Sequence, residues 1–278
     1  MEPDDEEAPA GDDSGAAEGV EVCCYDNRGM GRSSVPEQKS QYTTVIMAKD
    51  ALALMDHLGW RKAHVFGHSM GETHFLQPLP LVLLKILTVS ETGSMIASKL
   101  AAMAPDRVAS LALLNTTGGG YQCIPKEYLE EAVGSSTRRQ MLYREYVKGL
   151  SSGGMQSRHG FEGQLNAFWT HKLSTKELDR IRLAGFFVLI IHGRDDVIAQ
   201  LYYARRLAEK LQPAAKLVEL NGGHLVSHER PAEVNMSLME MIKASKSNTD
   251  LEEWSNLPKK SDAAIGKLGI DKKIYVAE

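Results

Sequence analysis

The sequence predicts an α/β fold, in which helices flank a mostly parallel sheet and a helical cap is inserted between two strands. Two observations support this class. From about residue 20, short apolar runs alternate with longer amphipathic runs, which is the pattern of βαβ units. Between residues 118 and 185 the strand-like runs stop, and helix-like segments surround the Ser- and Gly-rich stretch "GLSSGGMQSRHG". A helical insertion of this kind is expected to cap a binding site.

Five apolar runs and four amphipathic runs define the elements in order. The apolar runs have the length of buried strands, and the amphipathic runs have the length and spacing of helices. The expected strands cover 21–27, 63–68, 108–117, 186–193 and 216–221, and the expected helices cover 43–58, 94–103, 200–211 and 231–243. We expect these elements to form one domain over residues 20–244.

The two ends of the chain have a different composition. Residues 1–19 contain eight acidic residues and no Lys, Arg or aromatic residue, so a disordered acidic leader is expected. This leader has neither the basic start nor the apolar core of a signal peptide. Residues 245–278 are Lys-rich and lack apolar periodicity, which predicts a loosely ordered tail.

Charge and cysteine usage exclude several kinds of partner. After the leader, the chain contains 32 basic and 28 acidic residues, and the basic residues do not cluster, so no nucleic-acid partner is expected. Cys23, Cys24 and Cys123 have the spacing of neither a disulfide framework nor a metal site. Reduced cysteines predict a cytoplasmic protein. The sequence implies no metal and no other cofactor.

The stretch "HVFGHSMG" has the form of a nucleophile elbow. Ser69 stands in a G-x-S-x-G frame directly after an apolar run, with Gly67, His68, Met70 and Gly71 around it. A serine on such a sharp strand-to-helix turn needs small residues two positions to either side. The N–H of Met70 is then placed to stabilise an oxyanion.

Two later strand ends carry the acid and the base that a nucleophilic serine needs. "FFVLIIHGRDDVIAQ" offers Asp195 or Asp196, and "KLVELNGGHLVSHERPAEV" offers His224 or His228. The chain order Ser, Asp, His is that of triads on open α/β sheets, whose sites lie at the carboxyl ends of strands.

Over residues 20–244 these motifs resemble the α/β-hydrolase fold family, in particular its esterase, lipase and C–C hydrolase branch. The resemblance selects Asp196 over Asp195, because the family's acid lies three residues after the strand-end glycine, and it selects His224, which follows a Gly-Gly pair. It implies hydrolysis of ester-like substrates (carboxylesters, lipids or thioesters) by a Ser-His-Asp triad. It also identifies a structural brace in "YDNRGMGRSS", formed by Asp26, Arg28, Gly29, Gly31 and Ser33.

The chain departs from the family pattern at its front. The resemblance implies three strands before 21–27, together with a His-Gly loop that supplies a second oxyanion donor. The acidic leader stands in their place. We therefore expect an N-terminally truncated sheet in which 21–27 has lost its usual inner neighbour.

The chain also departs from the pattern directly after the elbow. Residues 72–93, "ETHFLQPLPLVLLKILTVSETG", read as an insert, because without them Gly71 leads straight into a coherent helix. The insert is expected either to loop out, leaving 94–103 behind Ser69, or to displace that helix from the core. Its apolar part, 79–89, is short and contains Lys85, so no membrane span or membrane partner is expected.

Two functions remain open from the sequence. The first is a serine hydrolase acting on a small ester-like molecule, impaired to the extent that the front and the insert disturb the fold. The second is a non-catalytic α/β-hydrolase-like protein that binds a ligand or a partner. No motif bears on the oligomeric state.

Overall fold

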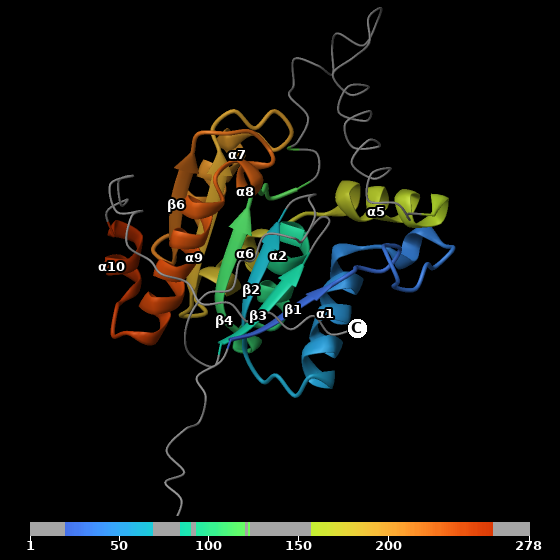
Figure 1. The fold of residues 1–278 in the computed structure, drawn as a ribbon, viewed down its shortest axis with the longest axis horizontal. Coiled ribbons are helices and arrows are strands. Elements are labelled where there is room, and N and C mark those ends of the chain that lie inside the picture. The colour runs from blue at the N-terminus through green and yellow to red at the C-terminus, as the bar shows by residue number, and fades with distance from the viewer. Residues whose placement is uncertain (1–19, 69–83, 90–92, 120–121, 123–156, 258–278) are drawn as a thin grey trace, which may run out of the picture.

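The computed structural model describes residues 20–68, 84–89, 93–119, 122 and 157–257 (Figure 1). The strands in these ranges are β1 (Val20–Tyr25), β2 (Ala63–His68), β3 (Leu84–Val89), β4 (Val108–Leu114), β5 (Phe187–Gly193) and β6 (Ala215–Leu220). The helices are α1 (Thr44–His57), α2 (Gly93–Met103), α5 (Arg158–Thr170), α6 (Thr175–Arg182), α7 (Leu201–Lys210), α8 (Val226–Glu229), α9 (Pro231–Lys246) and α10 (Leu251–Asn256). Short 3₁₀ turns are η1 (Lys39–Gln41) and η2 (Pro105–Arg107). The predicted leader, 1–19, and residues 258–278 of the predicted tail lie outside the described residues.

The described strands form one parallel sheet in the order β1-β3-β2-β4-β5-β6. Parallel neighbours need a crossover on one face of the sheet, and helices occupy both faces here (Figure 1). The predicted α/β class, with a parallel sheet and flanking helices, is confirmed.

The alternation of side chains along the central strands builds two cores. Leu111 and Leu113 of β4 belong to a core shared with α1, α2, α6 and α7. Ala112 and Leu114 point to the opposite face and belong to a core shared with α9 and α10. Because both faces are covered, a central strand is apolar at nearly every position, and its sequence shows a continuous run instead of an alternating one.

Local signals explain where several helices begin. Thr43 caps α1 by accepting a hydrogen bond from the N–H of Ile46 at 3.2 Å. Ser174 and Glu177 form a reciprocal capping box at the start of α6. Pro231 occupies the first turn of α9, where its missing N–H costs nothing. These caps satisfy backbone groups that a helix end otherwise leaves unpaired.

The strand β3 corrects the prediction for the insert. Residues 84–89 do not loop out; they pair with β1 along all six residues and with β2 from Ile86 to Val89. The expectation that the first strand lacks an inner neighbour is therefore wrong. A strand in this slot satisfies backbone groups of both β1 and β2 that would otherwise be left unpaired. The remaining parts of the predicted insert, 72–83 and 90–92, lie outside the described residues.

Helix α2 lies behind β2, as in the alternative in which the insert leaves 94–103 in its place. Ile96 and Leu100 are fully buried in the core. A Cβ at Gly67 would lie 2.6 Å from the carbonyl carbon of Gly93, so the start of α2 touches the end of β2. None of the helices in the described ranges combines the length and the apolarity needed to cross a membrane.

The region predicted as a cap, 118–185, divides into two parts. Helix α5 packs over η1 and contacts α1. Its Asn166 donates hydrogen bonds to the carbonyls of Lys39 and Tyr42, just before α1 begins. Helix α6 instead belongs to the main domain, because Ile181 is fully buried in the core beneath the sheet. Residues 120–121 and 123–156 lie outside the described residues.

The start of the predicted tail is also part of the fold. Helix α9 continues to Lys246, and α10 packs beside β6. Trp254 of α10 is fully buried and stacks on Phe187, with ring centroids 5.2 Å apart. The expectation of a loose tail from residue 245 is wrong for 245–257. A single large aromatic anchor has no periodicity, so the pattern of apolar residues could not reveal it.

Candidate active site

The segments that follow β4, β5 and β6 contact one another at the carboxyl edge of the sheet, where open α/β sheets place their sites. The loop after β5 carries Asp196 and the loop after β6 carries His224, the residues predicted as acid and base. Of the predicted elbow, Gly67 and His68 end β2. The other elbow residues, Ser69, Met70 and Gly71, lie outside the described residues.

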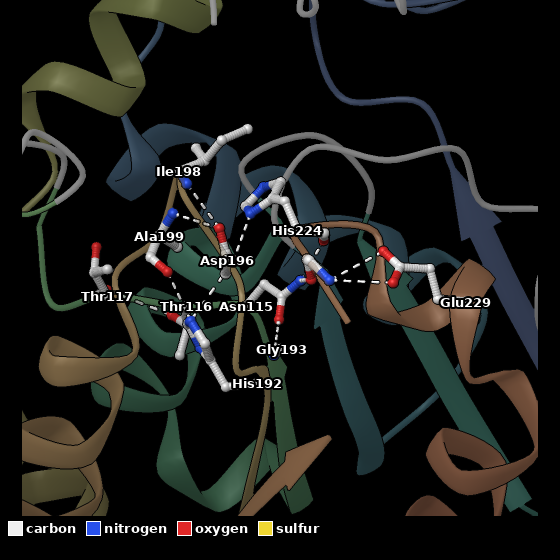
Figure 2. A network of polar contacts seen from close by, with 11 residues as sticks. Asn115, Thr116, Thr117, His192, Gly193, Asp196, Ile198, Ala199, His224 and Glu229 are labelled. Atoms are coloured by element: carbon white, nitrogen blue, oxygen red, sulfur yellow. Dashed lines mark hydrogen bonds and ion pairs between the residues drawn. The ribbon is translucent and has the colours of Figure 1, made fainter. Parts of the chain in front are cut away.

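Asp196 and His224 form a buried hydrogen-bonded pair (Figure 2). Their side chains are 0% and 7% exposed, and His224 Nδ1 lies 2.7 Å from Asp196 Oδ2. A carboxylate only accepts, so Nδ1 carries the proton and Nε2 of the neutral ring is the basic nitrogen. This Nε2 is buried, and no described residue hydrogen-bonds to it.

The second oxygen of Asp196 holds the carboxylate in one orientation. Asp196 Oδ1 accepts hydrogen bonds from the N–H groups of Ile198 and Ala199, each at 2.8 Å. His192 lies beside it and donates from Nε2 to the Ala199 carbonyl at 2.7 Å. Burial lowers the pKa of His192, so this neighbour is neutral at pH 7. Asp195, the alternative acid, is exposed.

His68 connects the end of β2 to the loop that carries His224. Its side chain is buried and lies close to the backbone of His224. Burial first, and then the proximity of His224 and His228, lowers the pKa of His68 to about 3. The His68 imidazole is therefore neutral at physiological pH, and it places no positive charge next to His224.

Two residues that the sequence analysis did not single out hold the loops in place. Asn115, directly after β4, hydrogen-bonds to Gly193 and to the His224 carbonyl (Figure 2). Glu229 accepts a hydrogen bond from the Gly223 N–H at 3.1 Å. The sequence analysis placed Asn115 inside the expected strand 108–117, whereas β4 ends at Leu114, so Asn115 did not stand out as a strand-end residue.

Gly193 lies against the loop that carries His224. A Cβ at Gly193 would lie 2.6 Å from the Gly222 carbonyl oxygen and closer still to that of Gly223. We expect Gly193→Ala to push the loop of His224 away and to destabilise the fold by about 1–3 kcal/mol in urea unfolding. Gly223→Ala is the matched control, since its Cβ would make an ordinary contact of 3.5 Å with Glu229. Equal stability of the two variants would contradict this account.

The five residues predicted as a brace form one turn after β1. Ser33 Oγ donates to the Asp26 carbonyl at 2.6 Å, and the Arg32 N–H donates to Asp26 Oδ2 at 3.2 Å. Gly31 has a φ of +47°, and a Cβ there would lie 2.5 Å from Asp26 Cγ. A residue with a side chain therefore cannot replace Gly31 without opening the turn.

The brace is tied to the helices around it. Arg28 donates to both carboxylate oxygens of Asp50 in α1, each at 2.6 Å. Gln164 of α5 donates to the Arg28 carbonyl at 2.9 Å. Gly29 has a φ of +82° and lies against Tyr42. The loop thus connects β1, α1 and α5.

No cluster of three or more His, Cys, Asp or Glu side chains suited to a metal ion occurs within the described ranges. The chemistry available at this edge of the sheet is that of an oriented imidazole, with a carboxylate on one nitrogen and an open second nitrogen.

Comparison with known proteins relates this arrangement to a large family. A family profile described as alpha/beta hydrolase fold matches residues 8–72. A Caulobacter sp. (strain K31) protein named "Putative carbamate hydrolase RutD" is 30% identical over 231 residues, which span 80% of this chain and 80% of that protein.

Two further matches differ in coverage. The dihydrolipoyllysine-residue acetyltransferase component of the acetoin cleaving system from Pseudomonas putida is 27% identical over 80% of this chain, but the match spans only 56% of that protein. The crystal structure of an enol-lactonase from Burkholderia xenovorans LB400 superimposes with a TM-score of 0.55 at 23% identity, covering 79% of each chain. At this identity the structural likeness shows the fold alone.

Proposed function

This chain belongs to the α/β-hydrolase fold family, and from that premise we propose that it is a serine hydrolase of ester-like substrates. The observation that carries the proposal is the buried Asp196–His224 pair, whose free imidazole nitrogen has no partner among the described residues. Ser69 follows His68, the last residue of β2, and the buried His68 side chain lies close to the backbone of His224. The same sheet edge thus presents an oriented base next to the strand that leads into the nucleophile motif.

The proposed reaction divides the work among three side chains. Ser69 Oγ attacks the substrate carbonyl carbon while His224 Nε2 accepts the hydroxyl proton, and Asp196 keeps the imidazole in the required tautomer. The carbonyl electron pair moves onto oxygen, where the Met70 N–H donates a hydrogen bond. Collapse of this intermediate expels the alcohol or thiol, which receives the proton from His224.

A water molecule completes the cycle. His224 accepts a proton from the water, whose oxygen attacks the acyl carbon, and Ser69 leaves with the returned proton. The carboxylic acid is released and the starting state is restored. The scheme invokes no metal or organic cofactor, since the activated nucleophile and the proton carrier are both side chains.

The substrate class follows from the reacting centre. Hydrolysis through a serine acyl intermediate needs a carbonyl with a leaving heteroatom, as carboxylesters, lipid esters and thioesters have. The name of the relative above, a carbamate hydrolase, describes a carbonyl group of the same kind. We propose a cytoplasmic location for this activity, because the three cysteines of the sequence do not have the spacing of a disulfide framework.

A fluorophosphonate probe tests the proposal directly. We expect wild-type protein to be labelled on Ser69 and to hydrolyse p-nitrophenyl esters, and Ser69→Ala to lose both properties. Ser237→Ala in α9, where the half-buried hydroxyl donates to the Glu233 carbonyl of the same helix, is the control and is expected to keep them. Folded wild-type protein that is not labelled, or a Ser69→Ala variant that still is, would favour the non-catalytic alternative.

A further inference from the structure

We propose that Asn115 is a positioning residue that holds the catalytic loops of Asp196 and His224 in register from the end of β4. The proposal deepens the proposed function, because its catalytic consequence requires that His224 acts as the base. Its structural part is independent of activity and can be tested on the resting protein.

The backbone of Asn115 is in an uncommon conformation. Asn115 has a φ of +49°, whereas residues other than glycine usually avoid positive values. Its N–H still donates to the Ile191 carbonyl at 2.9 Å, which continues the pairing of β4 with β5. Figure 2 shows the side chain between the loops that follow β5 and β6. The turned backbone and the retained strand bond together direct the amide between these loops.

The side-chain amide uses both of its ends. Asn115 Oδ1 accepts a hydrogen bond from the Gly193 N–H at 3.0 Å, three residues before Asp196. Asn115 Nδ2 donates to the His224 carbonyl and lies 3.4 Å from that of Gly223. The residue is fully buried. One amide group therefore joins the loop of the acid to the loop of the base.

The chemistry of these contacts explains why an asparagine is required. The group must accept from one backbone N–H and donate to a carbonyl, and a neutral amide of this length does both. An aspartate would keep the acceptor but would present a carboxylate to the oxygens of Gly223 and His224. A smaller residue would leave buried backbone groups without partners, which is costly. His224 is then held at two places. Asp196 accepts from Nδ1 of its ring, and Asn115 donates to its backbone carbonyl.

The first experiment measures the hydrogen bond in wild-type protein. With asparagine labelled by ¹⁵N, the side-chain amide protons of Asn115 are expected to exchange with water far more slowly than those of Asn221. Asn221 is a suitable reference because it is exposed. Its side-chain hydrogen bond within the described residues uses Oδ1, which accepts from Arg194 at 3.2 Å, and leaves the NH₂ group to solvent. Equally fast exchange of the two amides in folded protein would overturn the proposal without any variant.

The second experiment separates positioning from general support of the fold. Asn115→Asp keeps the size of the side chain, and Asn115→Gly tolerates the positive φ. We expect kcat for a p-nitrophenyl ester to fall about 100-fold in both, because a displaced base loses its alignment, while KM stays within about threefold. Asn221→Asp should match wild type. Unchanged kcat in either folded Asn115 variant would overturn the proposal.

A third readout remains valid if the protein hydrolyses no ester. The His224 Nδ1 proton, shared with Asp196 at 2.7 Å, should give a proton resonance well downfield of the amides. We expect this resonance to shift or vanish in Asn115→Asp and to persist in Asn221→Asp. An inactive protein with this behaviour would refute the proposed function and retain the role of Asn115. An unshifted resonance in Asn115→Asp would refute that role.

Discussion

Replacement of Asp196 by asparagine is expected to lower kcat for ester hydrolysis about 10⁴-fold, the loss that follows when the acid of such a triad becomes an amide. The contacts of Asp196 determine how the amide would orient. Its Oδ1 accepts two backbone N–H groups, from Ile198 and Ala199, so the amide oxygen must take this place. The NH₂ group then faces His224 Nδ1 and donates to it. His224 would carry its own proton on Nε2, the nitrogen that must accept the proton of Ser69.

The neighbouring carboxylate offers a matched control for this variant. Asp195 is exposed, and Asp195→Asn changes the same charge one residue away without touching His224. We expect its kcat to equal that of wild type, and thermal melting of both variants should exclude unfolding as the cause. Comparable activity of Asp196→Asn and wild type would show that Asp196 does not orient the base.

Replacement of Trp254 by alanine is expected to destabilise the protein by about 3–5 kcal/mol, as for other buried aromatic residues. Trp254 stacks on Phe187, donates from Nε1 to the Val188 carbonyl at 3.2 Å and lies under the Lys216 ammonium at 5.1 Å. Removal of the ring leaves a cavity against β5 and frees α10. Because domains have a total stability of about 5–15 kcal/mol, urea unfolding should show a large decrease in the midpoint.

Trp254→Phe separates the packing from the hydrogen bond. A phenyl ring can still stack on Phe187, but it cannot donate to the Val188 carbonyl, so we expect less than half of the destabilisation caused by alanine. The same urea series measures both variants. If Trp254→Ala unfolds within about 1 kcal/mol of wild type, α10 is attached too weakly to belong to the domain, and residues from 245 onward are a tail after all.

The sequence predicted those elements whose signals are local. The strand 63–68 was predicted at its observed bounds, and helix 43–58 was predicted to within one residue at each end. A continuous apolar run bounded by turn residues is sufficient evidence for a strand buried on both faces. The same reasoning misassigned 84–89, since its surroundings departed from the expected order of motifs, although "LKILTV" has the length of an ordinary strand.

The candidate site was predicted residue by residue where a strand end carried a reactive side chain. Asp196 and His224 were selected from motifs. In the structure His224 Nδ1 lies 2.7 Å from Asp196 Oδ2, although the two residues are 28 positions apart in the sequence. Their assignment as acid and base remains a prediction. Asn115 was missed, because an amide after a strand has no motif. Its importance arises from two loops that approach it from other parts of the chain.

The sequence by itself determined the α/β class, five of the six strands in the described residues, and the residue types available for chemistry at the strand ends. Only the tertiary structure decided that 84–89 lies between β1 and β2, that α6 and Trp254 belong to the core, and that Asn115 joins the two loops. The physical reason is the range of the interactions. Periodicity and caps act within a few residues, whereas strand neighbours and loop contacts depend on which distant backbone groups are left to be paired.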